Sequence, residues 1–577
     1  MDSMNSVKTV MEWFEDRFPS IFAVSRFHAT EYPTPPNLSF AWAFGVLIMV
    51  FLMLQIVTGI GVAMFYKPDA AIAFNSIERF RRHVHWGWLL QSIHAVSPTF
   101  IFIFMYLHIG RGFYYGSYKS PREIVWWMGL FLLLAMMMES FMGYVLPWGQ
   151  MSYWAGTVIT GLASVIPVFG DTLVTWIRGD ILMSDATLSR FYSLHIALVP
   201  LAVIGGLIVG HIMALHDVGS NNPTGVAPLK KNKVPFFPYY VVKDLYVVGI
   251  VVTGFFFIIF FYPNLFLEAA NFQPADPSLT PAEIKPEWYF LPFFAMLRAI
   301  PSKGMGVVVL WGSMWILFFM PFIDRSKIKS NRYRPLKRCI DVIFFINFCF
   351  LTYLGAKPPF GWHLNAARIG AFIYFAYFVL LYIVSRYEKK PEALLAYESF
   401  PERITMHGSS AAKKSVSLII MIVGLGALNI WAFNFNFPSR ALIERGRSVY
   451  EAKGKMFHDI SLIGEYATLP AEQRIEMLGV LPPDLSLKNK SMIERTPREF
   501  LSEFIGASKE GSKMVVEFTP AEVDGLVAFL EYTSDPSMFW RARVGPWVIL
   551  FMSIFTVLLY MLYKDVWDIK YRSLPVE

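Results

Sequence analysis

Four histidines of this chain lie within long apolar stretches, where an ionisable side chain is costly and usually functional. His94 and His108 share one stretch, and His195 and His211 share another. Fourteen residues turn an α-helix by about 1,400°, so the first two side chains lie about 40° apart on one face and about 21 Å apart along the axis. Neutral imidazole is a standard axial ligand of haem iron. Two such pairs favour two stacked haems, each between one histidine of either helix, over ordinary core histidines.

The second pair does not follow the same spacing. His195 and His211 are sixteen residues apart, which separates them by about 160° on an ideal α-helix. They face the same two cofactors only if the helix is locally wound more widely. Pro200 and the pair Gly205–Gly206 lie between them, and such residues host kinks and bulges. We therefore predict a bulge or kink between the two histidines.

Glycines repeat the fourteen-residue interval on the neighbouring apolar stretches. Gly45 and Gly59 lie on the first stretch, and Gly129 and Gly143 lie on the third. Glycine allows the backbone to approach a flat ligand closely, although small residues are also common where membrane helices pack together. The match with the first histidine pair favours the interpretation that these glycines contact haem.

Membrane helices are needed to position these residues. Of the 577 residues, 55% are hydrophobic and 16% are charged, whereas soluble domains have about 25% charged residues. The apolar runs are continuous and about 20 residues long, which predicts helices rather than the alternating strands of a barrel. We predict ten spans, near residues 39–66, 88–112, 122–147, 190–215, 241–266, 304–324, 338–356, 366–386, 415–436 and 545–563.

Charged residues between these spans predict the orientation. The net charge of +8 arises largely in short loops, which the positive-inside rule explains without nucleic-acid binding. Clusters of Lys and Arg at 230–233 and 325–338 belong inside, and the acidic segment 263–303 belongs outside. The N-terminus is then inside. Residues 437–540 are charged, contain no spanning run, and form a predicted outer domain.

The two cysteines limit the kinds of cofactor. Cys339 and Cys349 do not form a C-x-x-C pair. The chain therefore holds no zinc knuckle, no cysteine-ligated iron–sulfur cluster and no covalent haem c. Any haem must be bound by other ligands.

Many segments between about residues 20 and 390 match one known family. They are GWLL at 87–90, YLHIGRGFYYGSY at 106–118, GYVLPWGQMSYW at 143–154, RFYSLH at 190–195, HIMALHDVGSNNPTG at 211–225, FPYYVVKDL at 237–245, the run 274–303, RYRP at 332–335 and GAKPP at 355–359. The chain resembles cytochrome b of cytochrome bc complexes. The resemblance implies eight helices, with a four-helix core that binds two haems b non-covalently. His94 and His195 would ligate the low-potential haem near the outer surface, and His108 and His211 the high-potential haem near the inner surface.

The resemblance also implies two quinone sites. PEWY at 286–289 matches the motif of the outer quinol-oxidation site. There Glu287 would accept a proton from quinol and Tyr289 would shape the pocket. A carboxylate at the membrane edge suits proton export, although a structural carboxylate that caps a helix is the alternative. At the inner site, His216 and Asp244 match residues that bind quinone and deliver protons.

Some positions depart from the family pattern. Gln91 stands where the family commonly has Arg, and Phe237 stands where it often has His. The interval from His195 to His211 also exceeds the family's. Contacts to the haem propionates and the haem potentials are expected to differ accordingly. Arg111 keeps a positive charge at the inner end of its helix and is expected to pair with a propionate.

The C-terminal part resembles the haem-c subunit of the same complexes. RGRSVY at 445–450, PPDLSL at 482–487 and the run 527–571 carry this match. Where the family has C-x-x-C-H, this chain reads EAKGKMFH at 451–458, so thioether attachment is impossible, and Met514 is a poor axial ligand. We infer a fused remnant that has lost its haem and keeps a docking or anchoring role. Non-covalent haem on His458 is the alternative.

The predicted fold is an all-α polytopic membrane protein: an eight-helix cytochrome b with a four-helix diheme core, plus two further transmembrane helices flanking a small extramembrane domain. The expected location is the bacterial inner membrane, with residues 437–540 on the periplasmic side. The expected divisions are an inside segment at 1–38, two cytochrome b regions at 39–230 and 231–390, a linker and ninth helix at 391–436, the outer domain at 437–540, and an anchor with an inside tail at 541–577.

The expected function is bifurcated electron transfer within a proton-translocating respiratory cytochrome bc complex. One electron from quinol would pass to a Rieske-type iron–sulfur protein, and the other would cross the two haems to quinone. The expected partners are that protein, a cytochrome that carries haem c, and a second copy in a homodimer. Three alternatives are a b-type subunit of another quinone-linked oxidoreductase, a haemless assembly or scaffold protein, and a transporter. A transporter would show inverted repeats and discontinuous helices, and the sequence indicates neither.

Overall fold

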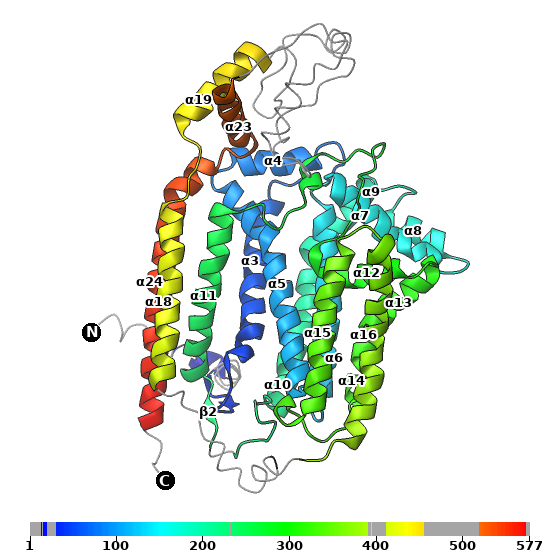
Figure 1. The fold of residues 1–577 in the computed structure, drawn as a ribbon, viewed down its shortest axis with the longest axis vertical. Coiled ribbons are helices and arrows are strands. Elements are labelled where there is room, and N and C mark those ends of the chain that lie inside the picture. The colour runs from blue at the N-terminus through cyan, green and yellow to red at the C-terminus, as the bar shows by residue number, and fades with distance from the viewer. Residues whose placement is uncertain are drawn as a thin grey trace.

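The computed structural model describes residues 13, 15–19, 30–229, 232–390, 394, 411–454 and 519–572. Long helices run side by side in Figure 1, with shorter helices beyond them at one end and a small strand at the other. The helices at the first end are α4 (Ala73–His83), α19 (Arg440–Val449) and α23 (Pro520–Ser534). At the other end, β2 (Val234–Pro235) pairs antiparallel with β1 (Pro33–Thr34). We name these ends outer and inner, after the orientation predicted from the loop charges.

Nine helices in the described part of the chain are long and apolar enough to cross a membrane. The first four contain η2 (Phe40–Ala43) with α3 (Phe44–Ala63), α5 (Gly87–Tyr115), α6 (Glu123–Val145), and a composite of α9 (Asp185–Ser193), η4 (Leu194–Ile204) and α10 (Gly205–Val218). The others are α11 (Tyr239–Phe261), α13 (Lys303–Trp315) with η8 (Ile316–Phe319) and α14 (Met320–Ile323), α15 (Pro335–Gly355), α16 (Gly361–Tyr387) and α24 (Met538–Arg572).

Short elements connect these helices. They are α7 (Gln150–Thr160), η3 (Gly161–Val165), α8 (Gly170–Arg178), η6 (Ala269–Phe272), η7 (Trp288–Phe290), α12 (Leu291–Ala299), η9 (Asn331–Tyr333) and η11 (Tyr450–Gly454). The PEWY motif at 286–289 runs into η7, and α12 follows it directly. The motif therefore lies in a segment that connects two spanning helices and not inside a spanning helix.

The all-α polytopic class predicted from the sequence is confirmed. The eight spans predicted between residues 39 and 386 coincide with observed helices, and the tenth lies within α24. The span predicted at 415–436 corresponds to α18 (Ala411–Phe433). Its apolar part, Leu418–Phe433, is shorter than the other nine spans.

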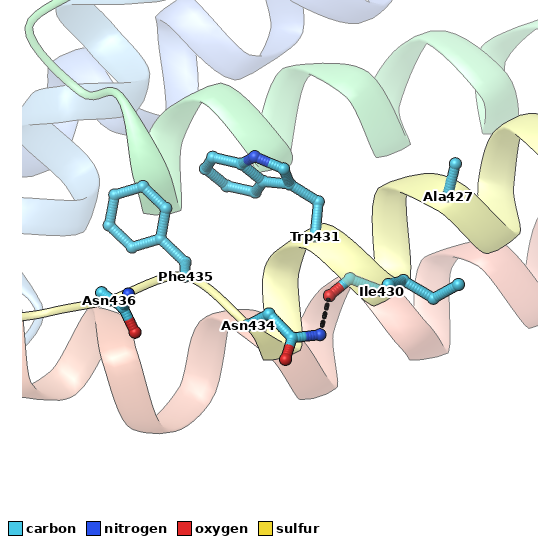
Figure 2. Close-up of a pocket in the computed structure, with 6 residues that line it drawn as sticks. All are labelled: Ala427, Ile430, Trp431, Asn434, Phe435 and Asn436. Carbon is cyan, nitrogen blue, oxygen red and sulfur yellow. Dashed lines mark hydrogen bonds between the residues drawn. The ribbon is translucent and has the colours of Figure 1, made fainter.

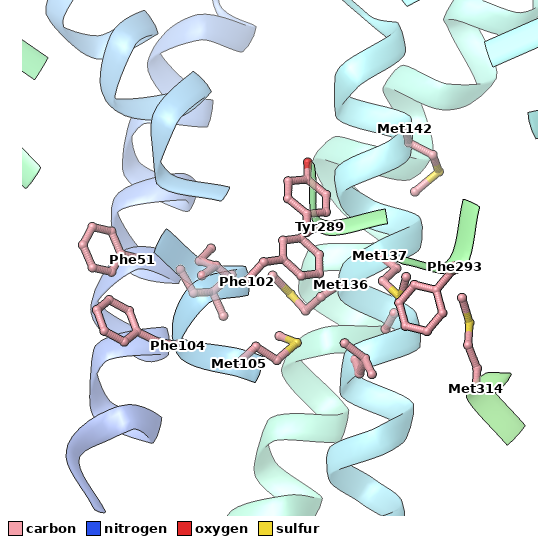
Figure 3. Packing of buried hydrophobic residues seen from close by; sticks show 14 of the residues in the cluster. Phe51, Phe102, Phe104, Met105, Met136, Met137, Met142, Tyr289, Phe293 and Met314 are labelled. Carbon is pink, nitrogen blue, oxygen red and sulfur yellow. The ribbon is translucent and has the colours of Figure 1, made fainter. Parts of the chain in front are cut away.

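Aromatic and methionine side chains fill the space between the helices of the core. Figure 3 shows Phe51, Phe102 and Phe104 on one side of this space and Met136 and Met137 on the other. The Phe51 and Phe104 rings stack with centroids 6.0 Å apart. Such pairs stabilise packing beyond the area they bury, and flexible methionines fill irregular gaps. The core is thus dense between the two levels at which the histidines lie.

Polar contacts at membrane depth join α18 to α24 and α24 to α11. Asn429 of α18 donates to the Ser553 hydroxyl of α24 over 2.9 Å. The Thr253 and Thr556 hydroxyls lie 3.2 Å apart between α11 and α24. Near the outer end of α18, an open apolar hollow of about 640 Å³ includes Trp431 (Figure 2). Hydrogen bonds of this kind between membrane helices fix which helices pair.

The outer helices α19 and α23 cross closely, and the C-terminal end of α23 contacts α4. A Cβ atom on Gly446 would overlap the carbonyl oxygen of Gly525, so the crossing depends on these two glycines. Arg81 of α4 donates to the carbonyl oxygen of Ser534 over 3.0 Å, and Arg82 donates to that of Thr533. Cations at the C-terminal end of a helix satisfy its last carbonyls and its dipole.

Candidate haem and quinone sites

The outer pair of histidines consists of His94 on α5 and His195 at the start of η4. Their ring centroids are 6.2 Å apart and their ring planes meet at 85°. The His94 Nδ1 lies 3.2 Å from the Thr58 hydroxyl. The His195 Nδ1 lies 3.2 Å from the carbonyl oxygen of Glu139 and 2.9 Å from its Oε1 atom. Partners on Nδ1 leave Nε2 of each ring as the atom available to a metal.

The inner pair consists of His108 on α5 and His211 on α10. Their ring centroids are 6.4 Å apart, with an interplanar angle of 60°. Among the described residues, His108 Nδ1 is buried without a hydrogen-bond partner. The structure therefore brings together both pairs of histidines that the sequence singled out.

The separation of the rings fits one metal ion between each pair. Imidazole nitrogens bind first-row metals at about 2 Å, which puts the centroids of two opposed rings roughly 6 Å apart. The observed separations are 6.2 Å and 6.4 Å. The donor set of two neutral nitrogens per ion is the one that b-type haem iron takes.

The helix between His195 and His211 carries the distortion that the sixteen-residue interval predicted. Leu194–Ile204 forms a π-helix with Pro200 inside it, and α10 continues from Gly205. A π-helix holds roughly 4.4 residues per turn, so its steps and the α-helical steps that follow come to about four full turns. The two histidines therefore return to one face, and the predicted bulge is confirmed.

Each of the four predicted glycines lies against one histidine. A Cβ atom on Gly143 would lie 2.5 Å from Cε1 of His195, and on Gly59 it would lie 3.0 Å from Cε1 of His94. The corresponding distances at the inner level are 3.2 Å from Gly129 to His211 and 3.5 Å from Gly45 to His108. The glycines thus make room for the imidazole rings. Contact of the glycines with haem stays a prediction.

The residues predicted from PEWY to form the outer quinone site are a partly buried carboxyl and a fixed tyrosine. Burial, followed by the neighbouring Glu268 carboxylate, raises the pKa of Glu287 to about 8. Tyr144 and Lys285 act in the opposite direction. Lys285 also pairs with Glu268 over 3.4 Å, and both side chains are partly exposed. Charged neighbours therefore lie between the partly buried Glu287 carboxyl and the outer surface.

Tyr289 is held on three sides. Its hydroxyl lies 2.5 Å from the Ser140 hydroxyl, and its carbonyl oxygen accepts from the Tyr106 hydroxyl over 2.5 Å. Its ring stacks on Phe102 with centroids 4.0 Å apart and planes 6° apart (Figure 3). A ring fixed in this way shapes the wall of a pocket.

The predicted inner-site residues lie on two helices near the N-terminal segment. His216 of α10 stacks on Tyr32 with ring centroids 4.2 Å apart. Asp244 of α11 is buried, and its neighbour Lys243 donates to the carbonyl oxygens of Leu38 and Ser39 over 2.8 Å. The segment 32–39 therefore contacts both helices that carry the predicted inner-site residues.

Arg111 lies one turn beyond His108 on α5. Its guanidinium is 5.1 Å from the Trp42 ring centroid, and its Nε atom is buried without a hydrogen-bond partner among the described residues. A buried donor of this kind fits an anionic group such as a haem propionate. Gln91 lies in the second turn of α5, and Phe237 lies two residues before α11. The predictions on His458 and Met514 fall outside the described residues.

Sequence reasoning missed Glu139, Ser140 and Tyr32. Glu139 had a usable signal, because it is the one acidic residue between Ile124 and Val145 in a spanning stretch. Tyr32 had none, since only the fold brings it to His216.

Comparisons with known proteins agree with this geometry. The family model for cytochrome b/b6/petB matches residues 29–219, and the model for cytochrome b (C-terminal)/b6/petD matches residues 274–375. Cytochrome b of Rickettsia typhi is 46% identical over 382 residues, which cover 66% of this chain and 95% of that protein. Cytochrome b/c1 of Bradyrhizobium diazoefficiens is 41% identical over 476 residues, covering 78% of this chain and 68% of that protein. A solved hyperthermophilic respiratory Complex III contains a chain with 35% identity and a TM-score of 0.62, covering 65% of this chain and 98% of that one. The chain belongs to the cytochrome b family.

Proposed function

We propose that this membrane oxidoreductase subunit couples quinol oxidation at the outer side to quinone reduction at the inner side, through two haems b. The complex would be a proton-translocating respiratory cytochrome bc complex. The observation that carries this proposal is the pair of opposed histidines at each of two levels, with ring centroids 6.2 Å and 6.4 Å apart.

Four histidines would hold the two haems. His94 and His195 would hold the haem at the outer level, and His108 and His211 would hold the haem at the inner level. Arg111 would neutralise a propionate at the inner level. Bound there, the haems supply one-electron transfer between the two sides of the membrane.

Glu287 would act as the base of the outer site. A carboxyl with a pKa of about 8 accepts a proton efficiently near neutral pH, because the best base has a pKa close to the working pH. The proton would then leave past Glu268, which is partly exposed. Tyr289, fixed by its hydroxyl contact with Ser140, would orient the quinol ring against the pocket wall.

At the inner site, His216 and Asp244 would bind quinone and deliver protons to it. Stacking on Tyr32 fixes the plane of the His216 ring. The Lys243 ammonium beside Asp244 is held by two backbone carbonyls, which keeps a positive charge near that carboxyl. Protons would be taken up from the inside for each quinone reduced.

The partners would be a Rieske-type iron–sulfur protein, a cytochrome carrying haem c, and a second copy of this subunit. The chain would lie in a bacterial inner membrane, with residues 437–540 as a periplasmic domain that lacks covalent haem. The contacts of Arg81 and Arg82 with the end of α23 support a docked role for this domain.

Optical spectra of the purified complex test the proposal. Reduced-minus-oxidised spectra should resolve two b components, and quinol should reduce a haem-c acceptor. Absence of both b components would contradict the redox role and support the scaffold alternative. A pyridine hemochrome spectrum of the isolated subunit should show haem b alone, and a c-type signal would refute a haemless C-terminal domain.

A further inference from the structure

Glu139 places a carboxylate directly on one of the four histidines. Its Oε1 atom lies 2.9 Å from Nδ1 of His195, and its backbone carbonyl oxygen lies 3.2 Å from the same nitrogen. The carboxylate Oε1 and the backbone carbonyl oxygen of Glu139 therefore both face Nδ1 of His195. The side chain of Glu139 is 13% exposed, and its Oε2 atom is buried without a hydrogen-bond partner among the described residues.

Such a carboxylate is unusual at this depth of the membrane. Acidic side chains inside spans are costly and point to function. Among the described residues, the ion-pair partner of Glu139 is His195. A hydroxyl or a backbone carbonyl would orient the ring equally well, so orientation alone does not explain why a charged group is present.

The other three histidines are surrounded differently. His94 Nδ1 faces the Thr58 hydroxyl, and His108 Nδ1 has no hydrogen-bond partner among the described residues. His211 lies beside the backbone of Val125, and its Nδ1 is also buried without a hydrogen-bond partner among the described residues. Val125 precedes Glu139 by fourteen residues, the interval that also separates Gly129 from Gly143 on this helix. Helix α6 thus presents the same backbone surface twice, with an apolar side chain at the inner level and a carboxylate at the outer level.

We propose that Glu139 is a positioning residue that lowers the reduction potential of the outer haem by accepting a hydrogen bond from Nδ1–H of His195. This inference rests on the proposed function, in which His195 binds iron through Nε2. A carboxylate acceptor on the far side of a ligating imidazole raises the basicity of the ligand. A more basic ligand and a nearby negative charge both favour the oxidised iron, and second-shell hydrogen bonding is a recognised control of haem potential.

Ser140 connects the contact between Glu139 and His195 to the proposed outer quinone site. Ser140, next to Glu139, contacts the Tyr289 hydroxyl over 2.5 Å. Two consecutive residues of α6 therefore touch the outer haem ligand and the PEWY motif. A lower potential at the outer level increases the driving force from the outer haem to the inner one, so the placement serves transfer in the inward direction.

Redox titration of the intact complex, followed by optical and electron paramagnetic resonance spectra, tests the proposal with two reciprocal variants. Glu139→Gln keeps the size of the side chain and removes its charge. It should raise the potential of the outer haem and shift its ferric signal, while the inner haem keeps its potential. Val125→Glu introduces a carboxylate beside His211 and should lower the potential of the inner haem alone. Met138→Leu, on the exposed side of the same helix, is the control and should move neither potential.

The outcomes separate this inference from the proposed function. If both haems are present and Glu139→Gln leaves the outer potential unchanged, the role of Glu139 is refuted and the function stands. If Glu139→Gln assembles without the outer haem, Val125→Glu decides, and an unchanged inner potential refutes the proposal. If the unaltered protein shows no haem b, the proposed function itself fails.

Discussion

The outer and inner levels of the four-helix core share one backbone plan and differ in the side chains around it. At both levels a glycine lies against each histidine, and the ring centroids are separated by nearly equal distances. The outer histidines contact Glu139 and Thr58 side chains, whereas no side-chain partner of Nδ1 is described for His108. The comparison teaches that one repeated backbone arrangement positions both histidine pairs, and that the side chains around each pair differ between the levels.

The two levels also differ in where their acid–base groups lie. At the outer end, Glu287 is partly buried close to Tyr289, whose hydroxyl contacts Ser140 of helix α6. At the inner end, His216 and Asp244 contact or flank the segment 32–39, which comes from outside the core. The proposed outer site would therefore use a connecting segment fixed against helix α6, and the proposed inner site would depend on the segment 32–39.

The strongest way to break the comparison is to remove one ligand from each level. His195→Leu should abolish one b component and lower quinol–cytochrome c activity by roughly 100-fold or more, because electrons lose one of the two haems. His108→Leu should abolish the other b component. Difference spectra measure both. Retention of two components in either variant would show that these rings do not ligate iron.

The next largest effect concerns the acid–base group of the outer level. Glu287→Gln should slow quinol oxidation by about 100-fold, which is typical of a lost general base. Because the pKa of Glu287 is raised to about 8, the deprotonated form becomes available as the pH rises through that value. The activity of the unaltered protein should therefore rise up to about pH 8, and that of Glu287→Gln should not.

Inner-site activity gives the control for that pH profile. Quinone reduction driven from the inner side should keep its own pH dependence in Glu287→Gln, because His216 and Asp244 are unchanged. A parallel loss of both pH profiles would mean that the variant has disturbed the whole fold.

A smaller effect should separate the two levels by packing. Alanine at Gly143 puts a Cβ atom 2.5 Å from the His195 ring, whereas alanine at Gly45 puts it 3.5 Å from His108, an ordinary contact. Gly143→Ala should therefore cost about 1–3 kcal/mol of stability and reduce the outer haem content. Gly45→Ala should keep its haem. Haem-to-protein ratios and Tm values check both, and equal losses would contradict the difference in space.

The smallest expected effect concerns the added segment of the inner level. Tyr32→Leu removes the ring that stacks on His216, and such stacking contributes about 0.5–1.5 kcal/mol. The KM for quinone at the inner site should rise by roughly 2–10-fold, while kcat/KM for quinol at the outer site stays constant. Tyr32→Phe keeps the stack and should behave as the unaltered protein. A raised KM in Tyr32→Phe would show that the hydroxyl, and not the ring, supports the inner site.

Much of the core could be predicted because its signals are periodic. The fourteen-residue interval of His94 and His108, and that of the glycines, follows directly from helix geometry. The longer interval from His195 to His211 predicted a distortion, and the π-helix η4 supplies it. Apolar runs predicted the spans within a few residues of the observed helices.

The parts that could not be predicted depend on contacts distant in sequence. Tyr32 reaches His216 from 184 positions away, and nothing in the local pattern around Tyr32 marks it. Arg81 and Arg82 dock on carbonyls near residue 534, a contact that depends on how α23 ends. Glu139 is the exception, since a lone acid in a spanning stretch already indicates a partner.

The wide winding of η4 has a consequence for changes in chain length. Removing two residues from Leu194–Ile204 would shorten the interval between the two histidines to fourteen. A regular α-helix would then present both histidines on one side, about 40° apart. Removing a single residue would leave an interval of fifteen, which separates the two ligands by about 60° on a regular α-helix and by less if one turn stays wide. The number of wide turns can therefore absorb a change of one or two residues in this helix, and the π-helical segment is the part of the chain where such a change leaves both ligands on one face.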